Sequence, residues 1–324
     1  MGTLNCKAMQ NVRPTSTGKP ARKPPAPAIR PAQVIEELRP GQSIELLKEL
    51  HILTRDGKLN QDTRRKLKQV YHLYQFIEPL LAEASVNGQG FALADHGAGK
   101  SYLGFILYDL FFNVARNGQV IHGPNHGHIY GIEARTELVE KSRALAERLG
   151  FAHMSFLNLQ VAQATVSAEL PATVDIVTAL HACDTATDDA IAFGLAKGAR
   201  HMVLVPCCQA EVAGLLKKSK ALNLHRNPLA ELWRHPLHTR EFGSQITNVL
   251  RCLQLEANGY QVTVTELVGW EHSMKNELIL ASRPVVPNPS ITRAAQARLQ
   301  GVLDTLGLDL LAARFGASGG APAV

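Results

Sequence analysis

From residue 90 onward the sequence alternates between short apolar, β-branched runs and longer segments with helical periodicity. This alternation is typical of α/β proteins in which helices join parallel strands, and it predicts a doubly wound sheet. The last two strands lie close enough in sequence to form an antiparallel pair. The predicted strands are 91–95, 129–133, 154–159, 174–180, 202–205, 260–268 and 277–282, and the predicted helices are 36–51, 61–84, 101–116, 137–149, 186–197 and 290–314.

The positive charge of the chain is concentrated at its start. The formal net charge is +6, and six basic residues precede Glu36, the first acidic residue, so the remainder carries no formal net charge. Residues 1–32 are rich in proline and basic residues, and we expect them to be disordered. The rest is predicted as a helical extension at 33–84, a sheet domain at 85–285 with a helical substrate-side section at 207–259, and a C-terminal helix with a flexible tail at 286–324.

Composition excludes several classes of protein. No apolar run approaches the roughly 18 residues that a membrane-spanning helix needs, so we expect no membrane span. The N-terminal residues also lack the apolar core of a secretory signal. The five cysteines are odd in number and show no disulfide spacing, which indicates free thiols in a reducing compartment. We therefore expect a cytoplasmic protein.

A glycine-rich turn follows the first predicted strand, in the stretch from Asp95 to Ser101 that reads DHGAGKS. Glycines let backbone N–H groups approach a ligand closely, and the helix that follows favours polar or anionic groups at its start. A phosphate-binding P-loop would need a glycine where Ala94 stands, and a dinucleotide fold would need one at Tyr102. Glu133 ends the second predicted strand, where an acid can bind ribose hydroxyls. This combination favours S-adenosylmethionine (SAM).

Three motifs together resemble one family, the class I SAM-dependent methyltransferases that share them. They are D-x-G-x-G-K from Asp95, L-H-x-C-x-x-A-T-D from Leu180, and the paired cysteines that follow Pro206. The resemblance covers residues 58–283 and extends to an acceptor-stem tRNA 2′-O-methyltransferase and to the methyltransferase half of a glutathione S-transferase C-terminal-domain-containing protein. The sequence lacks the zinc-finger segments of the tRNA enzyme, so the particular substrate of that enzyme does not transfer.

The resemblance implies a Rossmann-like methyltransferase fold with seven strands, the last antiparallel, and SAM as methyl donor. By position, Asp95, Gly97 and Gly99 would line the methionine part of SAM, and Glu133 would bind the ribose. Asn158 or Gln160 would lie near the adenine.

The ends of the fourth and fifth strands would face the methyl group. His181 could accept a proton from the attacking group, oriented by Asp184. A cysteine nucleophile that adds to a base is a second possibility. A zinc site is a third, but adjacent cysteines cannot easily bind one ion, and we predict no metal. The candidate catalytic residues are His181, Cys183, Asp184, Cys207 and Cys208.

Basic and polar side chains flank this end of the predicted sheet and favour an anionic acceptor. RNA, either tRNA or rRNA, is therefore the expected acceptor and partner. A protein methyltransferase and a non-catalytic SAM-binding interaction module are the alternatives. The candidate substrate-binding residues are Arg64, Arg65, Lys66, Gln209, His238, Arg240 and Asn276.

Overall fold

The structure is a computed structural model that describes residues 37–85, 90–113, 115–116, 119–120, 127–182, 184–207, 209–219, 231–232, 234–267 and 277–316. The chain divides into two units, Met1–Glu37 and Leu38–Val324, and all the described helices and strands belong to the second. Among them, no helix is both long and apolar enough to cross a membrane.

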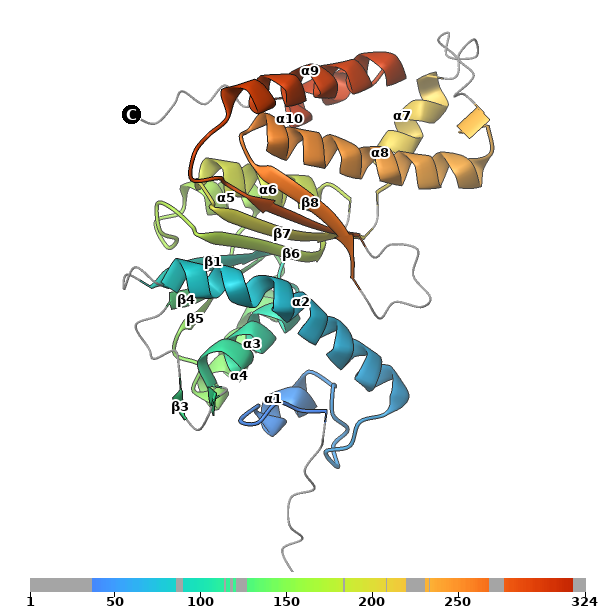
Figure 1. Cartoon of the computed structure of the whole chain (residues 1–324). Coiled ribbons are helices and arrows are strands. Elements are labelled where there is room, and N and C mark those ends of the chain that lie inside the picture. The colour runs from blue at the N-terminus through green and yellow to red at the C-terminus, as the bar shows by residue number, and fades with distance from the viewer. Residues whose placement is uncertain are drawn as a thin grey trace, which may run out of the picture. The chain divides into compact units, whose positions relative to one another are not determined.

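The second unit is built on a seven-stranded sheet with the order β5-β4-β1-β6-β7-β9-β8 (Figure 1). The first five of these strands are parallel, whereas β9 runs antiparallel to both of its neighbours. This is the Rossmann-like methyltransferase sheet, so the predicted fold is confirmed, including the antiparallel last strand. The strands are β1 (Phe91–His96), β4 (Gly127–Glu133), β5 (Met154–Asn158), β6 (Ile176–Ala182), β7 (His201–Pro206), β8 (Gln261–Glu266) and β9 (Glu277–Ser282).

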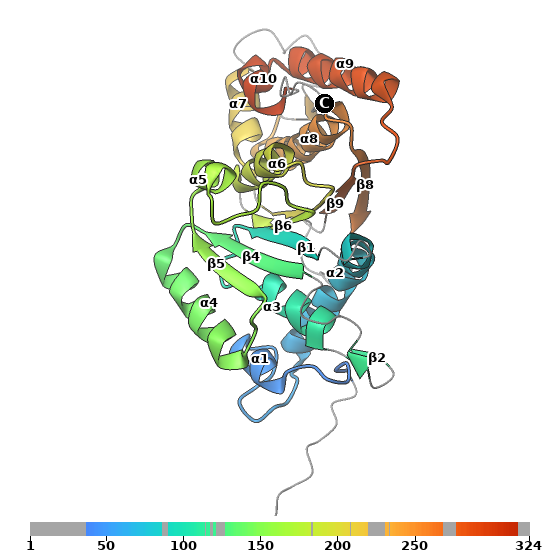
Figure 2. The ribbon, with the colours of Figure 1, turned by 90° about the vertical axis from the view of Figure 1, so that its left-hand side faces the viewer.

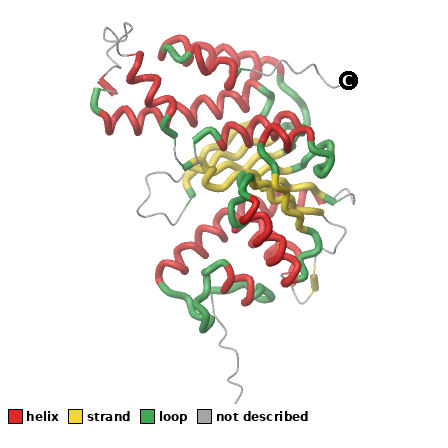
Figure 3. Tube along the Cα trace, turned by 180° about the vertical axis from the view of Figure 1, so that it is seen from behind, coloured by secondary structure: helices red, strands yellow, loops and turns green. Residues whose placement is uncertain are grey.

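Helices cover both faces of this sheet, as the views from the side and from behind show (Figures 2 and 3). One face carries α2, α3 and α4, and the other carries α5, α6 and α8. Their bounds are α2 (Gln61–Ser85), α3 (Tyr102–Tyr108), α4 (Thr136–Leu149), α5 (Val161–Val166), α6 (Ala186–Ala196) and α8 (Pro236–Ala257).

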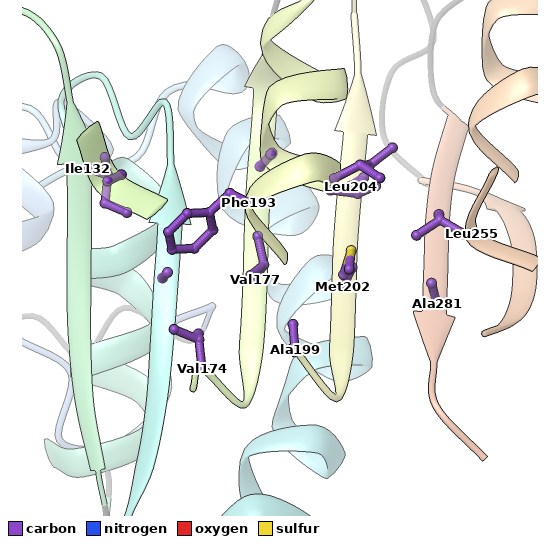
Figure 4. Close-up of a cluster of buried hydrophobic side chains, with 14 of the residues drawn as sticks. Ile132, Val174, Val177, Phe193, Ala199, Met202, Leu204, Leu255 and Ala281 are labelled. Atoms are coloured by element: carbon purple, nitrogen blue, oxygen red, sulfur yellow. The ribbon is translucent and has the colours of Figure 1, made fainter. Parts of the chain in front are cut away.

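The main core lies between the sheet and the face that carries α6 and α8. Phe193 of α6 is fully buried against side chains of the central strands, including Val177 and Met202 (Figure 4). Every residue of β7 is buried, because helices cover both faces of a central parallel strand. This two-sided burial explains why residues 202–206 of the strand form a continuous apolar run with no alternation.

A second, helical core forms where α7 (Glu211–Ser219), α9 (Pro289–Leu306) and α10 (Ala312–Phe315) pack with α8 around Leu250. The predicted single helix over 290–314 is wrong in its extent, since α9 ends at Gly307, whose φ of 62° terminates the helix. A short 3-10 turn, Asp309–Leu311, then leads into α10.

The N-terminal helix is shorter than the predicted 36–51 and comprises only α1 (Ile44–Glu49). Pro40 and Gly41 precede it, and the φ of 89° at Gly41 is incompatible with a helix. Ser43 caps α1 by accepting a hydrogen bond from the Leu46 amide at 3.1 Å. The Ser43 amide in turn donates to both carboxylate oxygens of Asp109, which anchors α1 to the helix after α3.

The predicted helix over 101–116 is also too long. Regular α-helix ends at Tyr108, and Asp109–Asn113 continues as a π-helical turn. Residues Ala115–Arg116 form a strand, β2, that pairs with β3, Gln119–Val120. The sequence between them is Asn-Gly, a strong hairpin signal that the helical periodicity obscured.

Candidate functional site

The glycine-rich turn lies at the carboxyl edge of the sheet, between β1 and β4. The Ala98 amide donates to the carbonyl of Ile132 at 3.0 Å, which holds the turn against the end of β4. Gly97 and Gly99 have φ values of 66° and 59°, which glycine adopts without strain. A Cβ on Gly97 would meet no protein atom within 4 Å, so the space above the turn is open.

Glu133 joins the end of β4 to this turn. Its Oε2 accepts a hydrogen bond from the Gly99 amide at 2.7 Å, and its Oε1 accepts from the amide and the Nε of Arg135, each at 3.0 Å. Burial raises the pKa of Glu133, but the hydrogen bonds from Arg135 and Gly99 outweigh burial and hold the pKa below its ordinary value. The structure thus places an ionised carboxylate, with two acceptor oxygens, beside the turn.

Asp95 lies beneath the turn and is only 2% exposed. Thr178 of β6 donates a hydrogen bond to its Oδ1 at 2.8 Å. Burial raises the pKa of Asp95 to about 7. Asp95 therefore ties β1 to β6 below the backbone that would contact a ligand.

Several buried polar atoms next to the turn have no hydrogen-bond partner among the described residues. They are both ring nitrogens of His96, the hydroxyl of Ser101 and the hydroxyl of Tyr102. Burial lowers the pKa of His96 to about 4, so its ring is neutral at physiological pH. Unpaired buried polar groups cost about 1–3 kcal/mol each, and a polar ligand over this turn would relieve part of that cost.

Asn158 lies at the end of β5, opposite Glu133 in the β4–β5 register. Its amide donates to the carbonyls of Glu133 and Ala134 at 3.1 and 2.8 Å, and its Oδ1 accepts from the Thr136 hydroxyl at 3.0 Å. Asn158 therefore fixes the loop that carries Glu133. Gln160, the alternative residue, caps α5 through a reciprocal capping box with Gln163.

The backbone brings the second and third motifs to the same edge of the sheet, because Ala182 and Pro206 are partners in the β6–β7 register. Asp184 is exposed, has a φ of 50°, and accepts a hydrogen bond from the Ala210 amide at 3.3 Å. The Cys207 thiol is half-buried after β7. The predicted residues Cys183 and Cys208, and the side chain of His181, lie outside what the structure describes.

A buried polar network supports these loops from α8. Arg251 is fully buried and donates to Asp188 Oδ1 at 2.5 Å, to the Asp184 carbonyl at 2.8 Å and to Asn248 Oδ1 at 3.1 Å. The motif residue Asp188 is thus a partner of Arg251. The sequence signal for this pair was a single arginine within an apolar helical stripe, which requires an acidic partner when buried.

Gln209, a predicted substrate contact, belongs to the same network. It is 5% exposed, its amide donates to Asn248 Oδ1 at 2.8 Å, and its Oε1 accepts from the Ser244 hydroxyl at 2.6 Å. The Gln209 side-chain amide therefore joins the loop after β7 to α8 through hydrogen bonds within the protein. A substrate would have to displace these bonds to reach it.

The remaining predicted substrate residues lie on two helices. Arg64 and Lys66 are exposed on the first turns of α2, and Arg65 lies 3.9 Å from Asp62. His238 and Arg240 are exposed near the start of α8, where Arg240 pairs with Glu241 at 2.9 Å. Asn276 lies outside the described residues. Within the described part of the chain, no cluster of three His, Cys, Asp or Glu side chains could hold a metal ion.

Comparison with known proteins agrees with this arrangement. A family model described as a methyltransferase domain matches residues 65–214, a stretch that runs from the start of α2 into α7. No curated protein matched the chain significantly.

Many solved structures match the chain at low similarity. Magnesium protoporphyrin IX methyltransferase from Synechocystis PCC 6803, solved with S-adenosylhomocysteine (SAH), is 16% identical with a TM-score of 0.42, and the match covers 74% of this chain and 93% of that one. An rRNA methylase from Streptococcus thermophilus is 8% identical with a TM-score of 0.38, covering 64% and 94%. Fibrillarin from Aeropyrum pernix, solved with SAM, is 12% identical with a TM-score of 0.34, covering 60% and 66%. At these scores none of them indicates a substrate for this chain.

The residues at the turn fit SAM as the cofactor of a methyltransferase domain. The Glu133 carboxylate lies at the turn, a Cβ on Gly97 would meet no protein atom within 4 Å, and buried polar atoms without a partner among the described residues lie alongside. The matched domain and the order of the sheet strands support the same cofactor.

Proposed function

We propose that the protein is a SAM-dependent methyltransferase that methylates RNA. The observation that carries the proposal is the Glu133 carboxylate at the end of β4, bonded to the Gly99 amide of the turn after β1. This bond brings an acidic group and an open glycine turn together at the carboxyl edge of a methyltransferase-type sheet, where α/β proteins bind their ligands.

Each residue of the turn has a role in holding the cofactor. Gly97 and Gly99 admit the methionine part, Asp95 fixes the end of β1 below them, and Glu133 accepts hydrogen bonds from the ribose hydroxyls. Asn158 acts on the adenine side by holding the loop after β4. When bound, SAM supplies an electrophilic methyl group.

The acceptor end of the site requires a base. His181, at the end of β6, would take the proton that an attacking hydroxyl or ring nitrogen loses. Asp184, held by the Ala210 amide, would orient it. Cys183, Cys207 and Cys208 flank the same edge of the sheet, and covalent addition by a cysteine would apply only to a carbon acceptor.

RNA as the acceptor is supported by the charge of α2. Arg64, Arg65 and Lys66 lie on successive positions in its first turns, and Lys66 lines a pocket together with Leu180 of β6. Cationic side chains of this kind bind phosphates and confer salt-dependent affinity. His238 and Arg240 are exposed on α8 and would contact a longer RNA.

Methyl transfer in a cell extract tests the proposal. The purified protein is incubated with extract and SAM labelled in its methyl group, and the products are digested separately with ribonuclease and protease. The proposal predicts label that ribonuclease releases and protease does not. Label that only protease releases would make the protein a protein methyltransferase, and an absence of label in both would contradict catalysis.

A further inference from the structure

A small pocket opens beside the glycine-rich turn, next to Tyr102. Its volume is about 240 Å³. Ligand pockets for drug-sized molecules measure roughly 300–1,000 Å³, so this one suits a single ring system. It is lined by Lys66, Gln69, Val70, Leu73, Tyr102, Leu180 and Leu267.

The pocket lies at the carboxyl edge of the sheet, on the side covered by α2. Tyr102 directly follows the turn, Leu180 is near the end of β6, and Leu267 follows β8. Figure 1 shows the N-terminal half of α2 beside the end of β8, where these segments meet. The sequence neighbour of Leu180 is His181, the proposed base. The pocket therefore borders both the proposed cofactor turn, through Tyr102, and the end of β6, through Leu180.

Most of the pocket wall is apolar, and its polar groups come from Lys66, Gln69 and the Tyr102 hydroxyl. Val70, Leu73 and Leu267 are 8%, 2% and 2% exposed, which shows that they form a packed surface. The Tyr102 hydroxyl is buried and has no hydrogen-bond partner among the described residues. Burial raises the pKa of Tyr102, so the hydroxyl stays protonated and can both donate and accept. A ligand with a polar edge would satisfy it.

The mouth of the pocket is cationic. Lys66 is exposed at its rim, and Arg64 and Arg65 precede it on α2. A flat ligand with apolar faces, a polar edge and a nearby anionic group matches these walls, this hydroxyl and this rim. A nucleobase attached to its phosphate has that combination of properties, and enzymes that modify a base commonly take it out of the stack into such a pocket.

We propose that this pocket receives the nucleobase of the RNA nucleotide that is methylated, with its edge on the Tyr102 hydroxyl and its phosphate at Lys66. This inference rests on the proposed RNA methyltransferase function. It assigns Tyr102 and Lys66 to substrate binding, and it assigns Val70, Leu73, Leu180 and Leu267 to contact with the faces of the base.

The pocket is tested by measuring the methylation kinetics of variants, with an RNA that the wild-type protein methylates as the substrate. Tyr102→Phe keeps the ring and removes the hydroxyl, and we expect kcat/KM to fall about five- to tenfold, as for one lost hydrogen bond. Lys66→Gln should raise KM and lower the slope of log affinity against log salt by about one. The matched control is Lys68→Gln, which removes an exposed lysine of the same helix that does not line the pocket, and it should change nothing.

The outcomes separate this inference from the function on which it rests. If the wild-type protein methylates RNA and Tyr102→Phe and Lys66→Gln match it, the pocket assignment is overturned while the function stands. If the wild-type protein labels no RNA, the function and the nucleobase assignment both fail. Binding of SAH is measured for each variant, and unchanged binding shows that the fold and the cofactor turn are intact.

Discussion

Arg251 of α8 donates a hydrogen bond from its Nε to Oδ1 of Asp188 in α6 at 2.5 Å, and the two side chains are 0% and 5% exposed. The same guanidinium binds the carbonyl of Asp184, at the start of the loop that leads into α6. The pair therefore connects the helical core at α8 to the segment that follows His181. The pair thereby holds the loop after β6 against α8.

Breaking this pair should be costly. Arg251→Met leaves the Asp188 carboxylate buried, and among the described residues the remaining cationic neighbour is Arg314, at 3.6 Å. We expect the free energy of unfolding to fall by about 3–5 kcal/mol, measured by urea denaturation. The double variant Arg251→Met with Asp188→Leu should recover most of the loss.

Arg298→Met is the control for this prediction, since its pair with Glu256 involves an arginine that is 57% exposed. Exposed pairs of this kind contribute about 0–1 kcal/mol. An equal loss for the Arg251 and Arg298 variants would contradict a structural role for the buried pair.

Asp95 should make stability depend on pH. Burial raises its pKa in the folded chain to about 7, above the ordinary value of 3.8 for an aspartate. The folded state thus retains a proton that the unfolded chain releases, so the contribution of Asp95 is fully present below pH 4 and is lost as the pH rises to 7. Asp95→Asn removes this loss, and its free energy of unfolding at pH 7 should exceed that of the wild type by up to about 4 kcal/mol.

His96 should act in the opposite direction, which gives an internal control. Burial lowers its pKa to about 4, so its contribution is present above 6.5 and lost as the pH falls towards 4. His96→Asn should therefore lose less stability than the wild type on acidification. Identical pH profiles for the wild type and both variants would show that neither group is buried as described.

Gly97→Ala tests whether the turn is a ligand-binding surface. Gly97 and Gly150 have φ values of 66° and 69°, and a Cβ at either position meets no protein atom within 4 Å. Alanine in this conformation costs roughly 1–2 kcal/mol, so both variants should lose similar stability in thermal unfolding. Only Gly97→Ala should weaken SAH binding, because Gly150 ends α4 away from the turn. Equal binding by the two variants would argue against a ligand over Gly97.

Tyr102→Phe should stabilise the protein without ligand. The hydroxyl is buried with no partner among the described residues, and removing such a group recovers its desolvation cost of about 1–3 kcal/mol. A higher melting temperature together with slower RNA methylation is the expected pair of results. A lower melting temperature would show that the hydroxyl has a structural partner.

Much of the fold could be predicted from the sequence, because alternating β-rich and helical segments admit few topologies. Strand β9 has the predicted bounds, and β1 differs from them by one residue. Helix ends were harder to predict, because Pro40–Gly41 and Gly307 terminate helices through local backbone geometry that a periodicity of apolar residues does not reveal. The six-residue α5 is too short to show a period, and it was not predicted.

The sequence predicted those site residues that lie at the ends of strands. Glu133 lies beside the turn because β1 and β4 are neighbours. Gln209 and Asp188 could not be distinguished from ligand-facing residues by sequence, because their partners lie on α8, dozens of residues away. The pocket at Tyr102 is formed by residues from α2, from β6 and from the segment after β8. These segments are far apart in the sequence, so no local sequence pattern predicts the pocket.

Calorimetric titration of SAH into the protein tests the central claim most directly. The account predicts binding by the wild type, unchanged binding by Glu140→Gln, and binding about 10- to 100-fold weaker for Glu133→Gln, as expected for lost charge-assisted bonds. Glu140 is the control because it is exposed on α4, outside the turn. No binding by the wild type, or equal binding by Glu133→Gln and Glu140→Gln, would contradict a cofactor site between β1 and β4.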